Sequence, residues 1–444
     1  MKTKPFSKLT NTLFLISLLT LALAFNVQPA KSEDTTIYIK NDGSTQPPVP
    51  AIVTSDNITY TFTSNITGSI IVERSHIIIK GNNYTLMGSG TGKGFTLYMP
   101  TNVTISNITI THFAYGIYMD GPTRITITNN IITNNSYGIN FYRCSHNTIR
   151  NNTITNNNFG MFLSYSSRNN TIEANRVTAN REGGIGIWAG SNGNRILRNI
   201  VSGNTLQAYA YGIMLSYISN ATIAYNTVRN NYNNIIISNY SAYNVIKENN
   251  IADSIMYGIY LYGRTNKIRI IRNNITGSNT YGISFRISFN CTVYGNNIAN
   301  NTEGIAFYHL SANSTFYYNN FVGNTKHVVF NANISDFWDN GFAGNYWDDY
   351  AGSDADGDGI GDVPYVINLL NEDRYPLMSP YAKLRGDVNE DDKVDGKDLA
   401  IVTQVFGSYS CHERWNVQAD LNHDGKVDGK DVVIVVVNFG KTPF

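Results

Sequence analysis

Short runs of alternating apolar and polar residues recur through residues 94–330 of this chain. Most runs begin with an aromatic residue, a glycine and an aliphatic residue, as in Tyr137-Gly138-Ile139. The glycine, replaced by Asn234 in one repeat, recurs every 22 to 28 residues between Gly94 and Gly304. Alternation with a period of two predicts β-strands. Self-similarity at this spacing predicts a solenoid, in which each repeat buries its apolar residues against its neighbours.

Each repeat contains two further short apolar runs, such as Ile125-Thr126-Ile127 and Ile131-Ile132. Three short strands per repeat predict an all-β fold, a right-handed parallel β-helix of roughly a dozen coils. Asparagines also recur at one point of each coil and predict a ladder of stacked amides. The predicted ladder contains Asn130, Asn152, Asn175, Asn199, Asn226, Asn250, Asn274, Asn297 and Asn320.

Composition and charge add few constraints. The chain has 444 residues and a formal net charge of +1, which gives no general reason to expect nucleic-acid or membrane-surface binding. Residues 1–30 combine early lysines with an apolar run and predict a signal peptide, with a retained membrane anchor as the alternative. We expect an N-terminal cap in residues 31–66, β-helix repeats in 67–338, a C-terminal cap in 339–384 and a separate domain in 385–444.

The C-terminal domain contains two copies of one acidic motif, offset by 33 residues. Oxygen-bearing side chains at positions 1, 3, 5, 9 and 12, with a backbone carbonyl at position 7, predict a calcium-binding loop. The predicted ligands are Asp387, Asn389, Asp391, Lys393, Asp395 and Asp398 in the first copy, and Asp420, Asn422, Asp424, Lys426, Asp428 and Asp431 in the second. Position 6 is Gly425 in the second copy but Asp392 in the first, which weakens the expected tight turn of the first loop.

This duplicated motif, followed in each copy by an apolar helical stripe, resembles the dockerin domain over roughly residues 385–444. The resemblance implies calcium as the cofactor and a cohesin-type protein as the partner. In dockerins, the residues at positions 10 and 11 help to select that partner. The resemblance therefore implies Gly396, Lys397, Gly429 and Lys430 as candidate contacts. A calcium-stabilised cap without a partner is the alternative.

A third acidic segment precedes this domain. Asp354, Asp356, Asp358 and Asp362 alternate with glycines and other small residues, a pattern that suits calcium. Position 12 of this segment is Tyr365, so it is not a full EF-hand loop. The sequence predicts a metal site here, with a solvated turn as the alternative.

The repeats, together with Gly344-Asn345-Tyr346-Trp347 and Asp373-Arg374-Tyr375-Pro376-Leu377, resemble the NosD-type proteins over about residues 36–380. That family belongs with the carbohydrate-binding and sugar-hydrolase β-helices. Its name-giving members are periplasmic copper-binding proteins that help to mature nitrous oxide reductase. Copper binding needs clustered ligands, whereas the seven histidines here are scattered, without a Met-x-x-Met or His-x-x-His pair. Copper is therefore the less favoured expectation.

The sequence of the coils does not predict a set of catalytic residues. Their acidic residues are few and fall at different points of the repeat, unlike the clustered carboxylates of sugar hydrolases. Mannuronan epimerases carry Tyr-Gly-Phe-Asp-Pro-His after the equivalent turn, whereas here Tyr137-Gly138-Ile139 continues into Asn140-Phe141-Tyr142. A lyase could still use an arginine as its base, and the candidates are Arg143, Arg168, Arg264 and Arg286.

Several aromatic residues follow the inward aliphatic positions and are predicted to point outward. Flat rings on a rigid wall suit sugar rings, although tyrosines are also good strand formers. The predicted glycan-binding residues are Tyr118, Tyr142, Phe162, Tyr260, Tyr262 and Tyr308. We therefore expect a secreted or cell-surface β-helix that binds, and as an option processes, polysaccharide, attached through calcium-dependent docking to a cohesin-type partner. A polysaccharide lyase or glycoside hydrolase, a copper-binding accessory protein and a structural surface spacer are the alternatives.

Overall fold

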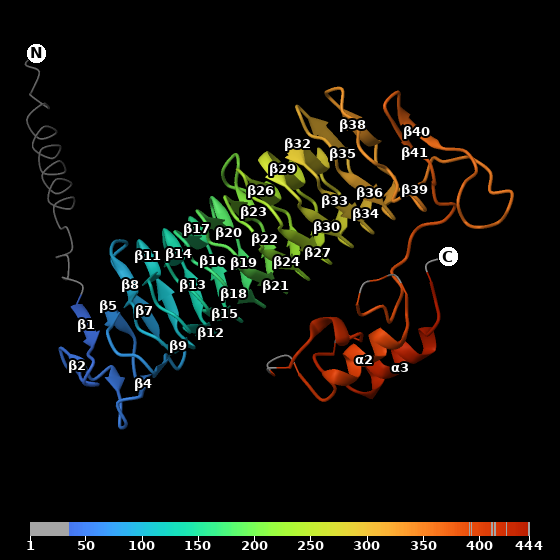
Figure 1. The fold of residues 1–444 in the computed structure, drawn as a ribbon. Helices are drawn as coiled ribbons and strands as arrows, with labels where there is room; N and C mark the ends of the chain where they lie inside the picture. The colour runs from blue at the N-terminus through green and yellow to red at the C-terminus, as the bar shows by residue number, and fades with distance from the viewer. Residues whose placement is uncertain are drawn as a thin grey trace, which may run out of the picture.

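The computed structural model describes residues 35–389, 391, 393–409, 412, 414–422 and 424–442. The predicted signal peptide lies outside these residues. The described chain forms a long parallel β-solenoid, followed by a small domain with two short helices (Figure 1). One sheet of the solenoid contains 13 strands, so the predicted fold class and the approximate number of coils are confirmed.

The longest strands, one per coil, form the first sheet of the solenoid. They pair in parallel register along the axis, and a short strand, β2 (Thr45–Gln46), pairs antiparallel with β1. The strands are β1 (Thr35–Ile39), β5 (Ile66–Val72), β8 (Lys93–Tyr98), β11 (Tyr115–Asp120), β14 (Tyr137–Tyr142), β17 (Phe159–Ser164), β20 (Gly183–Trp188), β23 (Tyr211–Ser216), β26 (Asn233–Ser238), β29 (Tyr257–Asn266), β32 (Tyr281–Phe289), β35 (Glu303–Tyr308) and β38 (Lys326–Phe330).

Two sheets of shorter strands complete each coil. The second sheet contains β3 (Ile52–Val53), β4 (Thr59–Phe62), β6 (Ile77–Lys80), β9 (Val103–Ser106), β12 (Thr126–Thr128), β15 (Thr148–Arg150), β18 (Thr171–Glu173), β21 (Arg195–Leu197), β24 (Thr222–Ala224), β27 (Val245–Lys247), β30 (Arg269–Ile271), β33 (Thr292–Tyr294) and β36 (Thr315–Tyr317). The third contains β7 (Thr85–Met87), β10 (Thr109–Thr111), β13 (Ile131–Thr133), β16 (Thr153–Thr155), β19 (Arg176–Thr178), β22 (Ile200–Ser202), β25 (Thr227–Arg229), β28 (Asn250–Ala252), β31 (Asn274–Thr276), β34 (Asn297–Ala299), β37 (Asn320–Val322) and β39 (Tyr346–Trp347).

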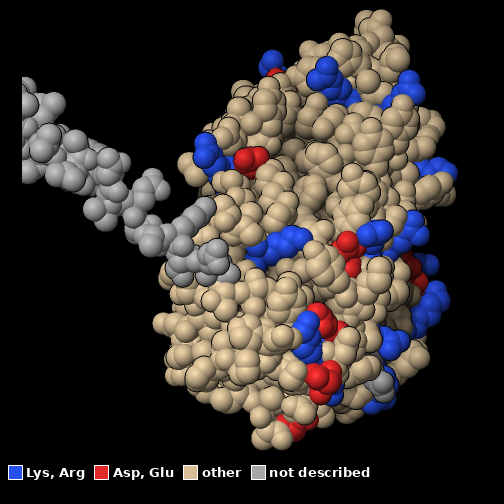
Figure 2. Space-filling view, turned by 90° about the vertical axis from the view of Figure 1, so that its left-hand side faces the viewer, with Lys and Arg blue, Asp and Glu red and all other residues tan. Residues whose placement is uncertain are grey.

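A single column of aliphatic and aromatic side chains fills the solenoid. Ile139, Met161 and Ile185 pair in register on successive coils, and none is more than 1% exposed. Each coil buries its apolar side chains against the coils on either side, which stabilises a stack of repeats that no single repeat could form alone. Figure 2 shows that uncharged residues form most of the viewed face and that the charged side chains gather mainly on its right-hand side.

The asparagine ladder is confirmed in the first coils but was wrong by one residue in the last four. The amide of Asn130 donates to Asn152, and the row continues through Asn175, Asn199 and Asn226. It then passes through the first asparagine of each later pair: Asn249, Asn273, Asn296 and Asn319. Asn250, Asn274, Asn297 and Asn320 begin the next strand instead. Adjacent asparagines made the two registers indistinguishable in the sequence.

Aromatic residues after the last coil cover the open end of the core. Trp347 of β39 stacks on Phe321 with a centroid distance of 4.2 Å, and Trp338 stacks on Phe316 at 4.5 Å. Both tryptophans are 1% exposed. A two-stranded hairpin, β40 (Tyr365–Asn368) and β41 (Asn371–Asp373), lies beyond them. This covering removes the unpaired apolar end that a solenoid would otherwise expose.

The C-terminal domain contains α2 (Gly396–Gln404), the 3-10 turn η1 (Val417–Ala419) and α3 (Gly429–Asn438). Each α-helix begins with a capping box, formed by Asp395 and Asp398 in α2 and by Asp428 and Asp431 in α3. The helices therefore start directly after the two acidic loops. Among the residues that the structure describes, none belongs to a helix with the length and apolarity to cross a membrane.

Candidate functional site

The outer face of the first sheet carries the predicted glycan-binding aromatics. Tyr115, Tyr137 and Phe159 stack in register along the axis, with successive ring centroids 5.1 and 5.0 Å apart. Tyr118 packs edge-on against Tyr115, and Phe162 packs edge-on against Tyr137 and at a tilt against Phe159. These contacts place the first and fourth residues of each strand on one surface, which is therefore a continuous aromatic strip.

A second aromatic group continues this strip on β29, β32 and β35. Tyr260 stacks between Tyr257 and Tyr262, with centroid distances of 4.2 and 4.9 Å. The hydroxyl groups of Tyr281 and Tyr308 lie 2.7 Å apart. Burial raises the pKa of Tyr257 to about 12, so its hydroxyl stays protonated at neutral pH. The group therefore presents rings and neutral hydroxyls together.

The two aromatic groups are joined by a patch that the sequence did not reveal. Tyr211 is only 6% exposed and lies across β20, where a Cβ on Gly183 would come within 2.4 Å of its ring. Tyr211, Met214 and Ile236 form a buried cluster separate from the solenoid core, and Trp188 packs against it. The Gly183-Gly184-Ile185-Gly186 run was the sequence signal for this patch, because glycines leave room for a side chain of a neighbouring strand to lie across their own strand.

Five polar atoms on this outer face are buried without a hydrogen-bond partner. They are Trp188 Nε1, Tyr211 OH, Asn233 Oδ1, Ser284 Oγ and Glu303 Oε2. Burial also raises the pKa of the Glu303 carboxyl. Buried polar groups in folded proteins are nearly always paired, and each unpaired group costs about 1 to 3 kcal/mol. Among the described residues, nine further atoms of this kind lie elsewhere in the molecule, so these five mark polar positions within the aromatic face.

The arginines that could serve a lyase have different surroundings. Arg143 is paired with Asp120 at 2.8 Å, Arg168 donates to the carbonyl oxygen of Gly190, and Arg264 donates to Tyr240. Arg286 follows the second aromatic group on β32, and a hydrogen bond with Tyr260 raises its pKa. Arg286 therefore lies beside Tyr260, and Arg143 lies over the ring of Tyr142, but the carboxylate of Asp120 already pairs with Arg143.

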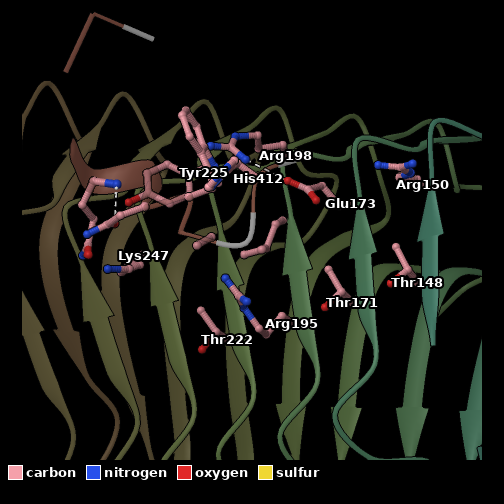
Figure 3. A pocket seen from close by; sticks show the side chains of 15 residues that line it. Thr148, Arg150, Thr171, Glu173, Arg195, Arg198, Thr222, Tyr225, Lys247 and His412 are labelled. Carbon is pink, nitrogen blue, oxygen red and sulfur yellow. Dashed lines mark hydrogen bonds and ion pairs between the residues drawn. The ribbon is translucent and has the colours of Figure 1, made fainter. Parts of the chain in front are cut away.

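A basic cleft lies between the second sheet and the C-terminal domain (Figure 3). Its volume is about 420 Å³. The solenoid contributes Arg150, Glu173, Arg195, Arg198 and Lys247 from neighbouring coils, and the far wall is formed by His412, Trp415, Asn416 and Gln418. Arg198 pairs with Glu173 at 2.8 Å and lies over the ring of Trp415. Among the described residues that line the cleft, four are basic (Arg150, Arg195, Arg198 and Lys247) and one, Glu173, is acidic.

The two predicted calcium loops share one hydrogen-bond pattern. Oδ1 of Asp398 accepts from the backbone N–H groups of Val388 and Asn389, and Oδ1 of Asp431 accepts from the equivalent groups of the second loop. Ligand oxygens of Asp387, Asp391 and Asp398 lie within 4.8 Å of one another. This oxygen-rich arrangement fits a calcium ion, which accepts six to eight hard ligands in flexible geometry.

The third acidic segment adopts the same local conformation as the second loop. Oδ1 of Asp354 accepts from the backbone N–H of Asp358, and its Oδ2 accepts from that of Gly359. Asp420 accepts from Asp424 and Gly425 in the same way. Oxygens of Asp354, Asp356 and Asp358 lie within 4.8 Å of one another, while Asp362 folds back onto the N–H of Ala355. The segment therefore has the first half of a calcium loop.

The predicted partner contacts lie at the start of the two helices. Lys397 and Lys430 have side chains that are 71% and 72% exposed, and each pairs with the carboxylate at position 5 of its own loop. Gly396 and Gly429 precede them, with open space where a Cβ would point. The four residues thus form two equivalent, accessible corners.

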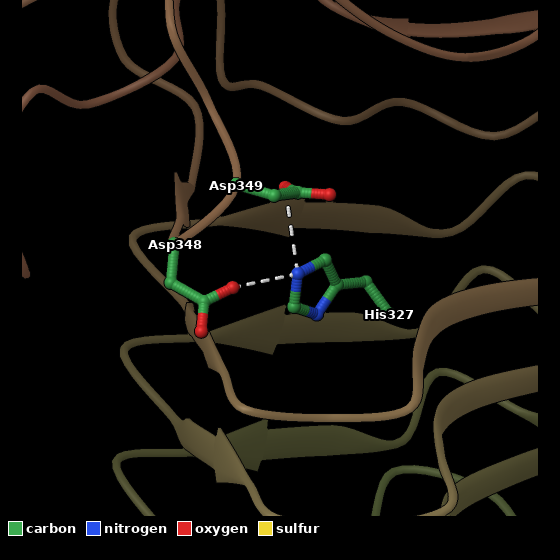
Figure 4. A group of neighbouring side chains, drawn as sticks. All are labelled: His327, Asp348 and Asp349. Atoms are coloured by element: carbon green, nitrogen blue, oxygen red, sulfur yellow. Dashed lines mark ion pairs between the residues drawn. The ribbon is translucent and has the colours of Figure 1, made fainter.

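A histidine and two aspartates form a further group that the sequence did not predict (Figure 4). Nε2 of His327 lies 2.9 Å from Asp348 Oδ1 and 3.4 Å from Asp349 Oδ1. The hydroxyl of Tyr365 donates to Asp349, and the His327 ring packs edge-on against the stacked rings of Phe321 and Trp347. His327 and the two aspartates lie roughly one coil apart, and only that repeat spacing could have signalled their contact.

The chain matches two family models. The model described as periplasmic copper-binding protein (NosD) matches residues 27–210 and 200–352, and the model described as dockerin type I domain matches residues 385–439. The probable ABC transporter binding protein NosD of Pseudomonas aeruginosa is 26% identical over 185 residues, which are 41% of this chain and 35% of that protein. The chain thus spans about a third of the length of that relative.

Two solved structures of mutants of the periplasmic alginate epimerase AlgG share the solenoid fold. They are 15% and 16% identical to this chain, each with a TM-score of 0.50. Each match covers 68% of this chain and 84% of the epimerase chain. At this identity the similarity shows the fold alone.

Proposed function

Because this chain belongs to the NosD family and carries a dockerin type I domain, we propose that it is an extracellular or surface-exposed glycan-binding protein. The outer face of the first sheet binds a polysaccharide chain along the solenoid axis. The dockerin domain binds calcium and attaches the solenoid to a cohesin-type partner. The aromatic rings that stack in register along this face are the observation that carries this proposal.

A polysaccharide matches the chemistry of this face. Its hydroxyl groups both donate and accept hydrogen bonds, which suits a face that carries tyrosine hydroxyl groups beside its rings, as in the Tyr281–Tyr308 pair. The apolar faces of sugar rings pack on exposed aromatic rings with little loss of side-chain freedom. The parallel register of the strands repeats these contacts along a line, which suits a polymer better than a compact ligand.

The test is retention on a panel of neutral and acidic polysaccharides, with the double variant Tyr260→Ala/Tyr262→Ala. Two lost ring contacts should cost about 2 kcal/mol, which weakens binding by roughly 30-fold. The matched control is Tyr217→Ala/Tyr240→Ala, which removes a stacked pair of exposed tyrosines from the turns that follow the first-sheet strands. Equal retention by both variants would show that the strip is not the binding face. Release of soluble products by the unaltered chain would instead support a lyase or hydrolase, with Arg286 as the first residue to replace.

The attachment function has its own test. Binding of a cohesin-type partner should require calcium and should fail in Asp431→Asn, because position 12 organises the second loop before α3. Lys430→Gln should weaken partner binding without weakening calcium binding, because the exposed Lys430 ammonium group pairs with the Asp424 carboxylate that calcium would also use. Partner binding that persists in a calcium chelator would contradict this part of the proposal.

Binding of a transition-metal ion at His327 is a second candidate function. An imidazole nitrogen and two carboxylate oxygens are donors that Cu²⁺ and Zn²⁺ accept. Nδ1 of His327 lies 3.4 Å from the amide nitrogen of Asn324, an arrangement that keeps the ring proton on Nε2. A metal ion bound at Nε2 would have to displace that proton. Copper binding therefore remains the less favoured function. Calorimetric titration with Cu²⁺ should give one site that is lost in His327→Ala and retained in His309→Ala.

A further inference from the structure

The segment that joins the solenoid to the dockerin domain is fixed to the solenoid wall. The ring of Tyr381 stacks on Tyr318 with a centroid distance of 4.8 Å, and its backbone N–H donates to Asn320 Oδ1. Two residues later, Nζ of Lys383 lies 2.7 Å from Glu248 Oε1. These contacts deliver the first calcium loop to one place beside the second sheet.

At that place an arginine of the solenoid binds a calcium ligand. Nη2 of Arg272 lies 3.1 Å from Oδ2 of Asp387 and 2.6 Å from the hydroxyl oxygen of Tyr294. The side chains of Arg272 and Asp387 are 3% and 0% exposed. Asp387 occupies position 1 of the first loop. A charge that is buried this deeply requires a partner of opposite charge. The ion pair therefore couples the charge on the first loop to the contact between the two domains.

The second loop provides an internal comparison. There Oδ2 of the position 1 carboxylate, Asp420, accepts a hydrogen bond from the backbone N–H of Gly425. In both loops Oδ1 of the position 1 carboxylate accepts from the N–H of position 5. The two loops therefore share their backbone frame, and the guanidinium group of Arg272 is bound to the first one.

We propose that Arg272 makes calcium binding by the first loop and docking of the dockerin domain on the solenoid oppose each other. The inference rests on the proposed calcium binding by both loops. A guanidinium group and a calcium ion are both positive, and both draw on the charge of the Asp387 carboxylate. Calcium therefore binds the first loop more weakly in the docked state than in the released state. By thermodynamic linkage, calcium weakens docking by the same factor.

The packing between the domains suits a reversible contact. Cavities of about 420 and 400 Å³ lie between the second sheet and the dockerin domain. Polar and charged residues such as Arg198, Glu248 and Gln418 line them. Polar, incompletely packed contacts between domains are typical of domains that move relative to each other. Calcium then acts on the position of the dockerin domain as well as on its folding.

The experiment measures calcium affinity by calorimetry in the full chain carrying Asp431→Asn, so that the first loop is observed. Adding Arg272→Gln should increase the affinity of that loop at least tenfold, which corresponds to about 1.4 kcal/mol. Arg272→Lys keeps the charge and should give a smaller increase. The matched control is Arg176→Gln, which removes an exposed arginine from the third sheet and should change nothing.

Small-angle scattering of the chain with both loops intact provides the second readout. Calcium should increase the maximum dimension when Arg272 is present, and Arg272→Gln should show the larger dimension without calcium. Tyr294→Phe is a milder variant that removes the hydroxyl bound to Arg272 and should shift both readouts in the same direction. Calcium affinity within twofold of the Arg272 chain, with scattering that does not respond to calcium, would overturn the inference. Absence of calcium binding by the second loop of the unaltered chain would overturn the proposed function as well.

Discussion

The adjacent residues Asn273 and Asn274 allow a direct test of what the asparagine ladder contributes. The side chain of Asn273 donates to the carbonyl oxygen of Ile246 and to Asn296 Oδ1, and it accepts from the backbone and side-chain N–H groups of Asn249. It is 1% exposed. Asn274 is exposed and belongs to a separate outer row of amides. The same substitution at two neighbouring positions therefore removes the same atoms from very different surroundings.

Asn273→Ala deletes four hydrogen bonds that involve the side chain. At about 1 kcal/mol net for each bond, the expected loss in the free energy of unfolding is about 4 kcal/mol. The loss is larger where Asn249 and Ile246 are left with unpaired buried groups. Asn274→Ala should cost no more than about 0.5 kcal/mol, because water replaces its lost contacts.

Urea-induced unfolding, followed by far-ultraviolet circular dichroism, measures both variants under one condition. Hydrogen exchange of the coils on either side of Asn273 should show that the loss is local, because each repeat contacts only its neighbours. Equal destabilisation by the two substitutions would refute the buried ladder, and a larger effect at Asn274 would restore the register expected from the sequence.

Three further predictions concern other parts of the chain. Burial raises the pKa of the Asp336 carboxyl to about 6, so the stability that it contributes is present below its unfolded pKa and is lost as the pH rises through about 6. Asp336→Asn should therefore stabilise the protein by up to about 3 kcal/mol at about pH 8 and by little at about pH 4, as measured by thermal denaturation. Burial raises the pKa of the thiols of Cys144 and Cys291 to about 12, so neither should react with a thiol reagent until the solenoid unfolds, as mass spectrometry can show. Gly186→Ala would place a Cβ within 2.6 Å of the Tyr211 hydroxyl, so it should weaken polysaccharide retention without lowering the melting temperature by more than a few degrees.

The repeat determined most of the fold in advance. Each coil repeats the same pattern of inward positions, so the burial of Ile139 and Ile213 could be predicted from local sequence alone. Register was harder, because Asn249 and Asn250 are chemically identical and only their three-dimensional surroundings distinguish them. The two acidic loops were recognisable because the residues of each motif are close in sequence. The His327 group and the Arg272–Asp387 pair are formed across coils and across domains, and no local spacing encodes them.

The aromatic strip was predicted only in part. Tyr118, Phe162 and Tyr260 follow an inward residue, and alternation alone places them outside. Tyr211 precedes its glycine, and its position across β20 depends on the absence of side chains at Gly183 and Gly186. The unpaired polar atoms were not predictable at all, because pairing depends on the exact geometry of neighbouring coils.

The contact of each coil with only its two neighbours has a consequence for how such proteins diverge. Duplication of one coil in the gene would extend the outer surface by about 4.8 Å and would require no new kind of interaction. Coils gained or lost on the N-terminal side of Thr148 would change the reach of the molecule while its junction with the C-terminal domain stayed intact. Length is thus a trait that this architecture can vary in whole steps, separately from attachment.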